Sequence, residues 1–211
     1  MNAPRLAMAA LSPVEFTSIK QAEDHLLQFG DLQGQTIEKM TQEHPMVDQC
    51  YFKGMTFLGD TFERFELTDV VFENCTLANC QLTGASWYRV QFKNCKLVGT
   101  TLDHAVLKDV AFQDCDLSLA NLNQAKLTNV TFTDSRLQEL NCLETQLRQV
   151  KLGGCDLDAA DFTETSLKKI DLTTCTFTTL QVTAVDVRGC RMTTEQAAYC
   201  AQLFLGVDWL A

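Results

Sequence analysis

Apolar residues recur at every fifth position along most of this chain. From Phe52 to Met192 every fifth residue is apolar, and we call these positions the centres. Of these 29 centres, 24 hold Leu or Phe. The residue two places earlier is mostly small or β-branched, and polar residues dominate the other three positions. Helices bury residues at spacings of three and four, and strands at spacings of two. A period of five fits neither, and it indicates a stacked repeat architecture.

A second period of twenty residues lies on top of the first. Like residues return in columns, which include Val70, Val90, Val110, Val130, Val150 and Ile170; Phe72, Phe92, Phe112 and Phe132; and Cys75, Cys95, Cys115, Cys155 and Cys175. These columns predict that four groups of five make one coil, with each column stacked up its inside. The sequence therefore predicts an all-β solenoid with four sides. Adjacent coils would lie ~4.8 Å apart, so the roughly seven coils of residues 50–192 would make a rod of about 34 Å.

The residues before the repeat predict a capping helix. Ser12 and Glu15 can form a capping box, Pro13 suits a first helical turn, and Gly30 suits a stop. We therefore expect residues 1–30 to hold an N-terminal capping helix within 12–30 and residues 31–192 to form the β-helix. Residues 31–49 are expected to form one or two degenerate coils, because Gln42 replaces an apolar centre and Pro45 occupies a small-residue site.

The residues after the repeat predict a second helix and a dimer. Thr193 and Gln196 form a possible capping box, and a helix is expected to about Leu205 within the tail 193–211. Capping one coil needs a single apolar stripe, yet this tail is apolar on more than one side. The surplus predicts a homodimer interface made of Ala197, Ala201, Leu203, Phe204, Leu205, Val207, Trp209 and Leu210. The alternative is a tail that simply folds back over the last coil.

Composition narrows the possible functions. The net charge of −10 argues against direct binding to nucleic acid, and no apolar run approaches a membrane span. Eight of the ten cysteines fall on the small-residue positions and none forms a zinc-type pair, so a reducing cytoplasm is expected. No catalytic, metal or cofactor constellation is present: His104 falls on an outward position and Cys142 on a buried centre. The sequence therefore predicts a non-catalytic protein without a cofactor.

The repeat resembles the pentapeptide-repeat family, whose pattern is A-(D/N)-L-x-x. The segments ANL at 120–122, ADF at 160–162 and CDL at 115–117 and 155–157 match it closely. The resemblance covers about two thirds of the chain and implies a right-handed quadrilateral β-helix. The unbroken coils followed by a helix and an apolar tail resemble the loopless members of the Qnr-like and mycobacterial fluoroquinolone-resistance branch. That branch consists of dimeric DNA mimics that bind DNA gyrase or topoisomerase IV.

Charge along the repeat supports the mimicry that this resemblance implies. Residues 97–192 carry 13 acids and 9 bases, whereas residues 50–96 carry 5 of each. The expected acidic, partner-binding face comprises Asp114, Asp116, Asp134, Asp156, Asp158, Asp161 and Glu164. The first hypothesis is a dimeric topoisomerase-binding protein that protects the enzyme from quinolone-type inhibitors. The alternatives are a scaffold or adaptor that binds another protein through a flat face, and a functional N-terminal arm on a rod that serves as spacer.

Overall fold

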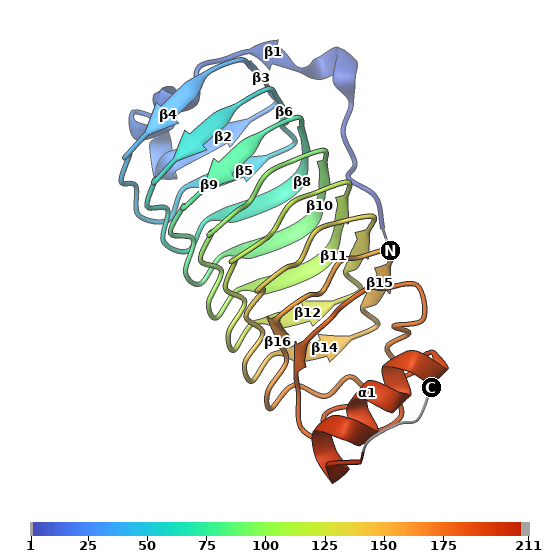
Figure 1. Ribbon diagram of the computed structural model, residues 1–211. Helices are drawn as coiled ribbons and strands as arrows, with labels where there is room; N and C mark the ends of the chain where they lie inside the picture. Colours follow the sequence, from blue (N-terminus) through green and yellow to red (C-terminus); the bar gives the residue numbers. More distant parts are fainter. Residues whose placement is uncertain (1, 208–211) are drawn as a thin grey trace.

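The computed structural model describes residues 2–207, which wind into about 8 coils stacked along one axis (Figure 1). Strand partners lie twenty residues apart: Phe72 pairs with Phe92, and Phe92 pairs with Phe112. All the strand pairs are parallel within the described part of the chain. Four groups of five therefore make one coil, and the predicted four-sided solenoid is confirmed.

A turn at the end of each group of five residues explains the five-residue period. From Gly54 to Lys169 the residue two places after each centre adopts positive φ, as at Asn94 (50°), Asp114 (54°) and Asp134 (48°). Asn, Asp and Gly recur there because they enter this left-handed region at the lowest cost. At Gly154 the requirement is doubled, since φ is 65° and a Cβ would collide with the carboxylate of Asp134 in the preceding coil. Each five is thus a short extended segment followed by a corner.

Four flat faces result, numbered here in chain order. Face 1 contains β3 (Gly30–Gln33), β6 (Tyr51–Lys53), the second halves of β8 (Glu66–Glu73), β10 (Ser86–Lys93) and β11 (Val106–Gln113), then β13 (Thr131–Thr133) and β15 (Lys151–Gly153). Face 2 contains β4 (Thr36–Glu38), β7 (Thr56–Leu58) and β9 (Thr76–Ala78), and continues as single bridges through Lys96, Asp116, Arg136, Asp156 and Thr176.

The other two faces complete each coil. Face 3 is a ladder of bridges through Thr41, Thr61, Gln81, Thr101, Asn121, Asn141 and Asp161, with β16 (Ala160–Asp161) and β17 (Leu180–Gln181) at its end. Face 4 contains β2 (Leu26–Gln28), β5 (Met46–Asp48), the first halves of β8, β10 and β11, then β12 (Lys126–Thr128) and β14 (Gln146–Arg148). Since β8, β10 and β11 cross the corner between them, faces 4 and 1 belong to one 12-stranded sheet.

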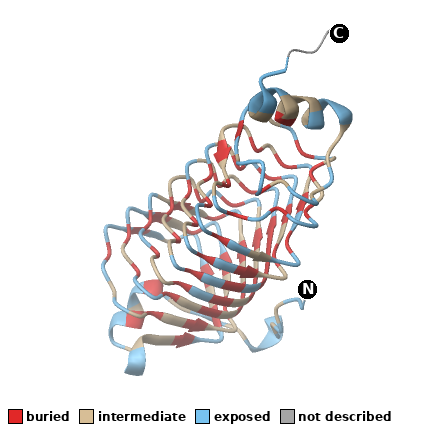
Figure 2. Cartoon of the chain, turned by 90° about the horizontal axis from the view of Figure 1, so that it is seen from below, coloured by how far each residue is buried: buried red, intermediate tan, exposed pale blue. Residues whose placement is uncertain are grey.

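The core fills the inside of the coils, where Figure 2 shows the buried residues. Phe72, Phe92, Phe112 and Phe132 stack with ring centroids 4.7, 5.0 and 4.9 Å apart and planes within 7° of parallel. This spacing matches the ~4.8 Å between neighbouring strands. The hydrogen-bonded ladder therefore sets the distance at which like side chains stack, which explains why the same residue types return every twenty positions.

The predicted helix over residues 12–30 is wrong. The segment instead forms η1 (Met8–Ala10), β1 (Ser12–Pro13), η2 (Phe16–Lys20) and η3 (Glu23–His25) before β2 begins. Ser12 and Pro13 pair with Gly30 and Asp31, so they are held extended by the first coil. Gly30 ends no helix: it occupies a small-residue site where an added Cβ would lie 2.7 Å from Val14 Cγ1.

The apolar residues of this segment nevertheless cover the end of the core. Phe16 and Ile19 are fully buried, and the Phe16 ring contacts Phe57 edge-on with centroids 5.0 Å apart. Regular coils begin with β2, and the degenerate coils expected in residues 31–49 are present as β3, β4 and β5. Pro45 is buried at its small-residue site, as predicted.

The predicted C-terminal helix is confirmed as α1 (Thr194–Leu205), with Thr193 and Gln196 forming a capping box and Gly206 ending it at φ 64°. The Gln196 side chain also donates to the carbonyl oxygens of Leu172 (2.9 Å) and Cys175 (3.0 Å) of the last coils. Tyr199 Oη accepts from the Leu180 amide at 2.9 Å. In residues 2–207 no helix has the length and apolar character needed to cross a membrane.

Candidate functional site: the charged faces and the exposed end

The predicted acidic residues do not form one uniform surface. Asp116, Asp156 and Asp158 lie on face 2, and Asp114 and Asp134 lie at the corner that precedes it. Asp161 and Glu164 lie on face 3 and at its far corner. The structure thus divides the predicted set between two adjoining faces.

Cations interrupt the acidic residues of face 2. Lys96, Asp116, Arg136 and Asp156 follow one another in successive coils of a single ladder. Arg136 Nη1 lies 3.2 Å from Asp116 Oδ2, and both side chains are partly exposed. Such a pair contributes only about 0 to 1 kcal/mol to stability, but it cancels charge locally. Face 2 therefore alternates in sign and is a poorer imitation of a phosphate backbone than the sequence indicated.

Several of the predicted acids accept hydrogen bonds from their own turn or from the next coil. Asp116 Oδ1 accepts hydrogen bonds from Ser118 N (3.0 Å) and Ser118 Oγ (2.7 Å), and Asp161 Oδ1 accepts from Thr163 N (2.8 Å). Asp158 Oδ1 accepts from the amides of Thr179 and Thr178, both at 2.8 Å, and these bonds lower its pKa. An aspartate that accepts from the backbone two residues on is a common turn device. These carboxylates are therefore held in place by the fold whether or not a partner is bound.

The acids of face 3 form the most continuous negative surface, because no cation lies among them. From Asp103 to Glu164 it has four acids and no cation: Asp103, Glu144, Asp161 and Glu164. Glu139, Asp156 and Asp158 adjoin it across the corner from face 2. We call these seven residues the acidic surface. Sequence reasoning missed Asp103, Glu139 and Glu144, although sorting charges by their place in the twenty-residue period would have found them.

The C-terminal end exposes some of the apolar side chains that the dimer prediction names. Of the predicted interface residues, Leu203 is 49% exposed, Leu205 74% and Val207 39%. Ala197 is also exposed, whereas Ala201 and Phe204 are half-buried. Trp209 and Leu210 lie outside the described residues. One side of α1 thus covers the last coil through Gln196, Tyr199 and Cys200, while another side remains open to solvent.

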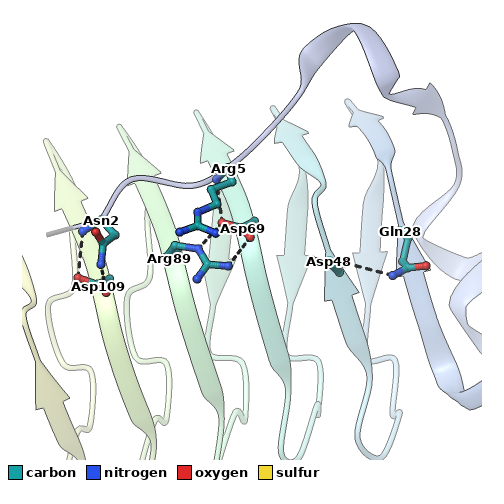
Figure 3. Close-up of polar contacts among 7 residues, drawn as sticks. All are labelled: Asn2, Arg5, Gln28, Asp48, Asp69, Arg89 and Asp109. Carbon is teal, nitrogen blue, oxygen red and sulfur yellow. Dashed lines mark hydrogen bonds and ion pairs between the residues drawn. The ribbon is translucent and has the colours of Figure 1, made fainter.

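The N-terminal arm, which comprises residues 2–7, runs along the corner between faces 4 and 1, and its Asn2 lies beside β11 (Figure 3). The Arg5 amide donates to Asp69 Oδ1 at 2.7 Å, and Asn2 donates through its amide and its side chain to Asp109, both at 3.0 Å. Asp69 also forms a two-bond ion pair with Arg89, in which both side chains are largely buried. Burial alone would raise the pKa of Asp69, but the bonds from Arg89 and Arg5 hold it below 3.8.

The side chains that most often carry chemistry are placed as the sequence indicated. His104 is exposed at a corner, and Cys142 is buried, which raises the pKa of its thiol. Burial likewise raises the pKa of Cys50 to about 11 and that of Cys80 to about 12. All 10 cysteines are free. Among residues 2–207 no group of three or more His, Cys, Asp or Glu side chains is placed to hold a metal ion.

Two models of pentapeptide repeats and one other family model match parts of this chain. A family model described as a pentapeptide repeat region matches residues 85–162, and a second, described as pentapeptide repeats (8 copies), matches residues 155–193. A model of the SV2A/B/C luminal domain matches residues 31–122. Among curated protein sequences, none matches this chain.

Solved structures with similarity to the chain include three repeat proteins. Full-length QnrB1, a plasmid-mediated fluoroquinolone resistance protein, is 19% identical; the match covers 87% of this chain and 99% of QnrB1, with a TM-score of 0.38. HetL from the cyanobacterium Nostoc sp. strain PCC 7120, involved in heterocyst differentiation regulation, is 15% identical over 79% of this chain and 86% of HetL, with a TM-score of 0.33. Rfr23 from Cyanothece 51142 is 16% identical over 62% of this chain and 89% of Rfr23, with a TM-score of 0.23.

Proposed function

The chain belongs to the pentapeptide-repeat family, and we propose that it is a non-catalytic protein that binds a type II topoisomerase. In this proposal the acidic surface occupies the basic DNA-binding groove of DNA gyrase or topoisomerase IV. Occupancy modulates the enzyme and shields it from quinolone-type inhibitors. The partner is chosen by the resemblance of the sequence to the Qnr-like branch, and the mode of binding by the charge on faces 2 and 3.

The observation that carries the proposal is the absence of any cation on face 3 between Asp103 and Glu164. The acidic surface crosses three coil steps, or ~14 Å at ~4.8 Å per coil. The backbone beneath it is held on both sides by hydrogen bonds, such as Asn141 N to Ala120 O at 2.9 Å and Asp161 N to Leu140 O at 2.9 Å. The carboxylates are thus presented at fixed spacing on a rigid support, which favours complementarity with a basic groove.

A homodimer through the C-terminal end would double this surface. In such a dimer, Val207 and the exposed side of α1 would supply the apolar contact. Two rods of about eight coils joined end to end would be ~77 Å long at ~4.8 Å per coil. The two acidic surfaces would then flank the centre of the dimer, since both lie in the C-terminal half of each rod. The ten free cysteines favour a reducing, cytoplasmic setting for such a complex.

A supercoiling assay tests the proposal. Purified protein is titrated into DNA gyrase, with and without a fluoroquinolone, and inhibition of supercoiling or rescue from the drug is expected. The triple variant Glu144→Gln, Asp161→Asn, Glu164→Gln should lose most of this effect. The control variant Glu15→Gln, Glu38→Gln, Glu63→Gln changes the net charge equally through exposed residues of the N-terminal half, and it should keep the effect. Absence of any effect on gyrase and on topoisomerase IV would refute the proposal.

The alternative function is an adaptor that binds another protein through a flat face. Uncharged, hydrogen-bonded ladders favour it, such as Asn141 Nδ2 donating to Asn121 Oδ1 at 2.9 Å on face 3. Exposed apolar side chains beside them also favour it, since Leu119 is 50% and Leu143 37% exposed. A monomer in solution that leaves both topoisomerases unaffected is the result expected of an adaptor.

A further inference from the structure

Six cations gather on face 4 in the C-terminal half of the rod. They are Lys108, Lys126, Arg148, Lys168, Lys169 and Arg188, and we call them the basic strip. All six are exposed. None of them takes part in any ion pair found within residues 2–207. The strip is therefore an unneutralised positive surface on a chain whose net charge is −10.

The strand register aligns these cations. Lys108, Thr128 and Arg148 are partners in successive coils, and Lys126 lies two residues before Thr128 on the same outward side. Lys168 and Arg188 continue the column at the twenty-residue interval, and the coil is still closed there by Lys169 N donating to Gly189 O at 2.9 Å. From Lys108 to Arg188 the strip crosses four coil steps, or ~19 Å.

The acids of this face do not cancel the strip. Asp109 and Asp186 are buried, and their carboxylates are already engaged. Asp109 accepts from Asn2, and Asp186 Oδ2 accepts from Thr183 N (2.9 Å) and Thr183 Oγ1 (2.7 Å). The described part of the N-terminal arm begins with Asn2 beside Asp109 (Figure 3), and all six cations of the strip are exposed.

Two exposed carboxylates border the strip from the neighbouring corner. Glu144 and Glu164 line an open hollow of about 570 Å³ together with Arg148, Lys168 and Lys169. Because the strip has six cations and only these two carboxylates border it, its net charge remains positive. The remaining exposed acids of this half of the rod lie on other faces. At physiological ionic strength fields decay over ~8 Å, so the strip acts on a ligand largely by its own charge.

The spacing of the cations along the strip favours a nucleic-acid strand over an acidic peptide as the ligand. Six charges over ~19 Å leave five intervals of ~3.8 Å on average, and a strand of duplex DNA carries one phosphate per ~3.4 Å of axis. An extended acidic peptide presents a side chain to one side only every second residue, or every ~6.6 Å, so it matches half of the cations. We propose that the basic strip binds the phosphate backbone of one nucleic-acid strand, without regard to sequence. This site adjoins the acidic surface at Glu144 and Glu164, but it does not depend on topoisomerase binding.

Salt-dependent binding to a duplex tests the proposal. The full chain is titrated against a fluorescent duplex of about 20 base pairs, and anisotropy is read between about 50 and 200 mM salt. If all six cations replace counterions, log K should fall with log salt at a slope of about −5. The variant Lys126→Gln, Arg148→Gln, Lys168→Gln should have a slope of about −3 and bind at least about tenfold more weakly at low salt.

A matched control separates the strip from total charge. Lys39→Gln, Lys53→Gln, Lys96→Gln makes the same change in net charge through exposed lysines on other faces, and it should bind like the unaltered protein. Circular dichroism establishes that both variants remain folded. The proposal is overturned if the duplex does not bind at low salt, or if the control loses as much affinity as the strip variant. It is also overturned if polyglutamate binds the strip while the duplex does not.

Discussion

Asp60 is a buried acid in an inward position that holds mostly small or β-branched residues in the other coils. It occupies the inward site two places before Phe62 and is fully buried. Its Oδ1 accepts from the Met40 amide at 2.6 Å, but its Oδ2 has no partner. Burial raises its pKa above the ordinary 3.8, and the nearby charge of Glu38 adds to the effect. A buried carboxylate oxygen without a hydrogen bond costs about 1 to 3 kcal/mol or more.

Other coils show which residue fits this site. Thr165 Oγ1 accepts from the Thr145 amide at 2.8 Å, as Asp60 accepts from Met40. At the same time Thr145 Oγ1 donates to the carbonyl oxygen of Leu122, twenty-three residues earlier, at 2.7 Å. In Asp60→Thr the hydroxyl would accept from Met40 and donate to Ile37. We expect the substitution to stabilise the protein by about 1 to 3 kcal/mol at pH 7, or ~2 to 10 °C in Tm.

The gain should depend on pH in a defined direction. Because the folded pKa of Asp60 is raised, the native state binds this proton more tightly than the unfolded chain. That contribution is fully present below 3.8 and is lost as pH rises through the folded pKa. The advantage of Asp60→Thr should therefore be smallest below pH 3.8 and should grow as pH rises through the folded pKa of Asp60.

Urea and thermal unfolding followed by circular dichroism, at several pH values, measure both effects. Asp60→Asn is the matched control, since it removes the charge and leaves a buried amide in the same place. It should remove the pH dependence while gaining less stability than Asp60→Thr. A threonine variant no more stable than the unaltered protein at neutral pH, or one whose advantage is independent of pH, would refute this reasoning.

Four further predictions follow from single contacts. Asp69→Asn leaves Arg89 buried without its counter-charge and should lower the free energy of unfolding, measured in urea, by about 3 to 5 kcal/mol. Because the folded pKa of Asp69 is lowered, this difference from the unaltered protein should shrink as pH falls through that pKa. Phe112→Leu breaks two ring stacks and should cost about 1 to 3 kcal/mol in the same assay. Thr193→Ala removes the cap of α1 and should cost about 1 kcal/mol, measured by thermal unfolding. Leu205→Glu should turn a dimer into a monomer in light scattering, whereas an unchanged mass would place the dimer contact elsewhere.

The regular part of the fold could be predicted because its repeat is local in origin. Each five contains its own inward centre and its own corner residue, so the period is visible without any tertiary information. The C-terminal helix could be predicted for the same reason, since Thr193 and Gln196 cap it through contacts three residues apart. The N-terminal segment could not, because Ser12 and Pro13 take their conformation from Gly30 and Asp31, with which they pair.

The charged surfaces also combine features that are local in origin with features that depend on distant partners. The number of acids, the coil period and the inward columns can be read from the residues alone, because these depend on residue type and local geometry. Which charges meet depends on the folded coil, because winding the chain brings residues twenty positions apart to within ~4.8 Å. Arg136 is thereby set against Asp116, Asp109 is buried under Asn2, and six cations are sorted onto face 4. A charge count along the chain averages over four faces, whereas a partner meets one face at a time.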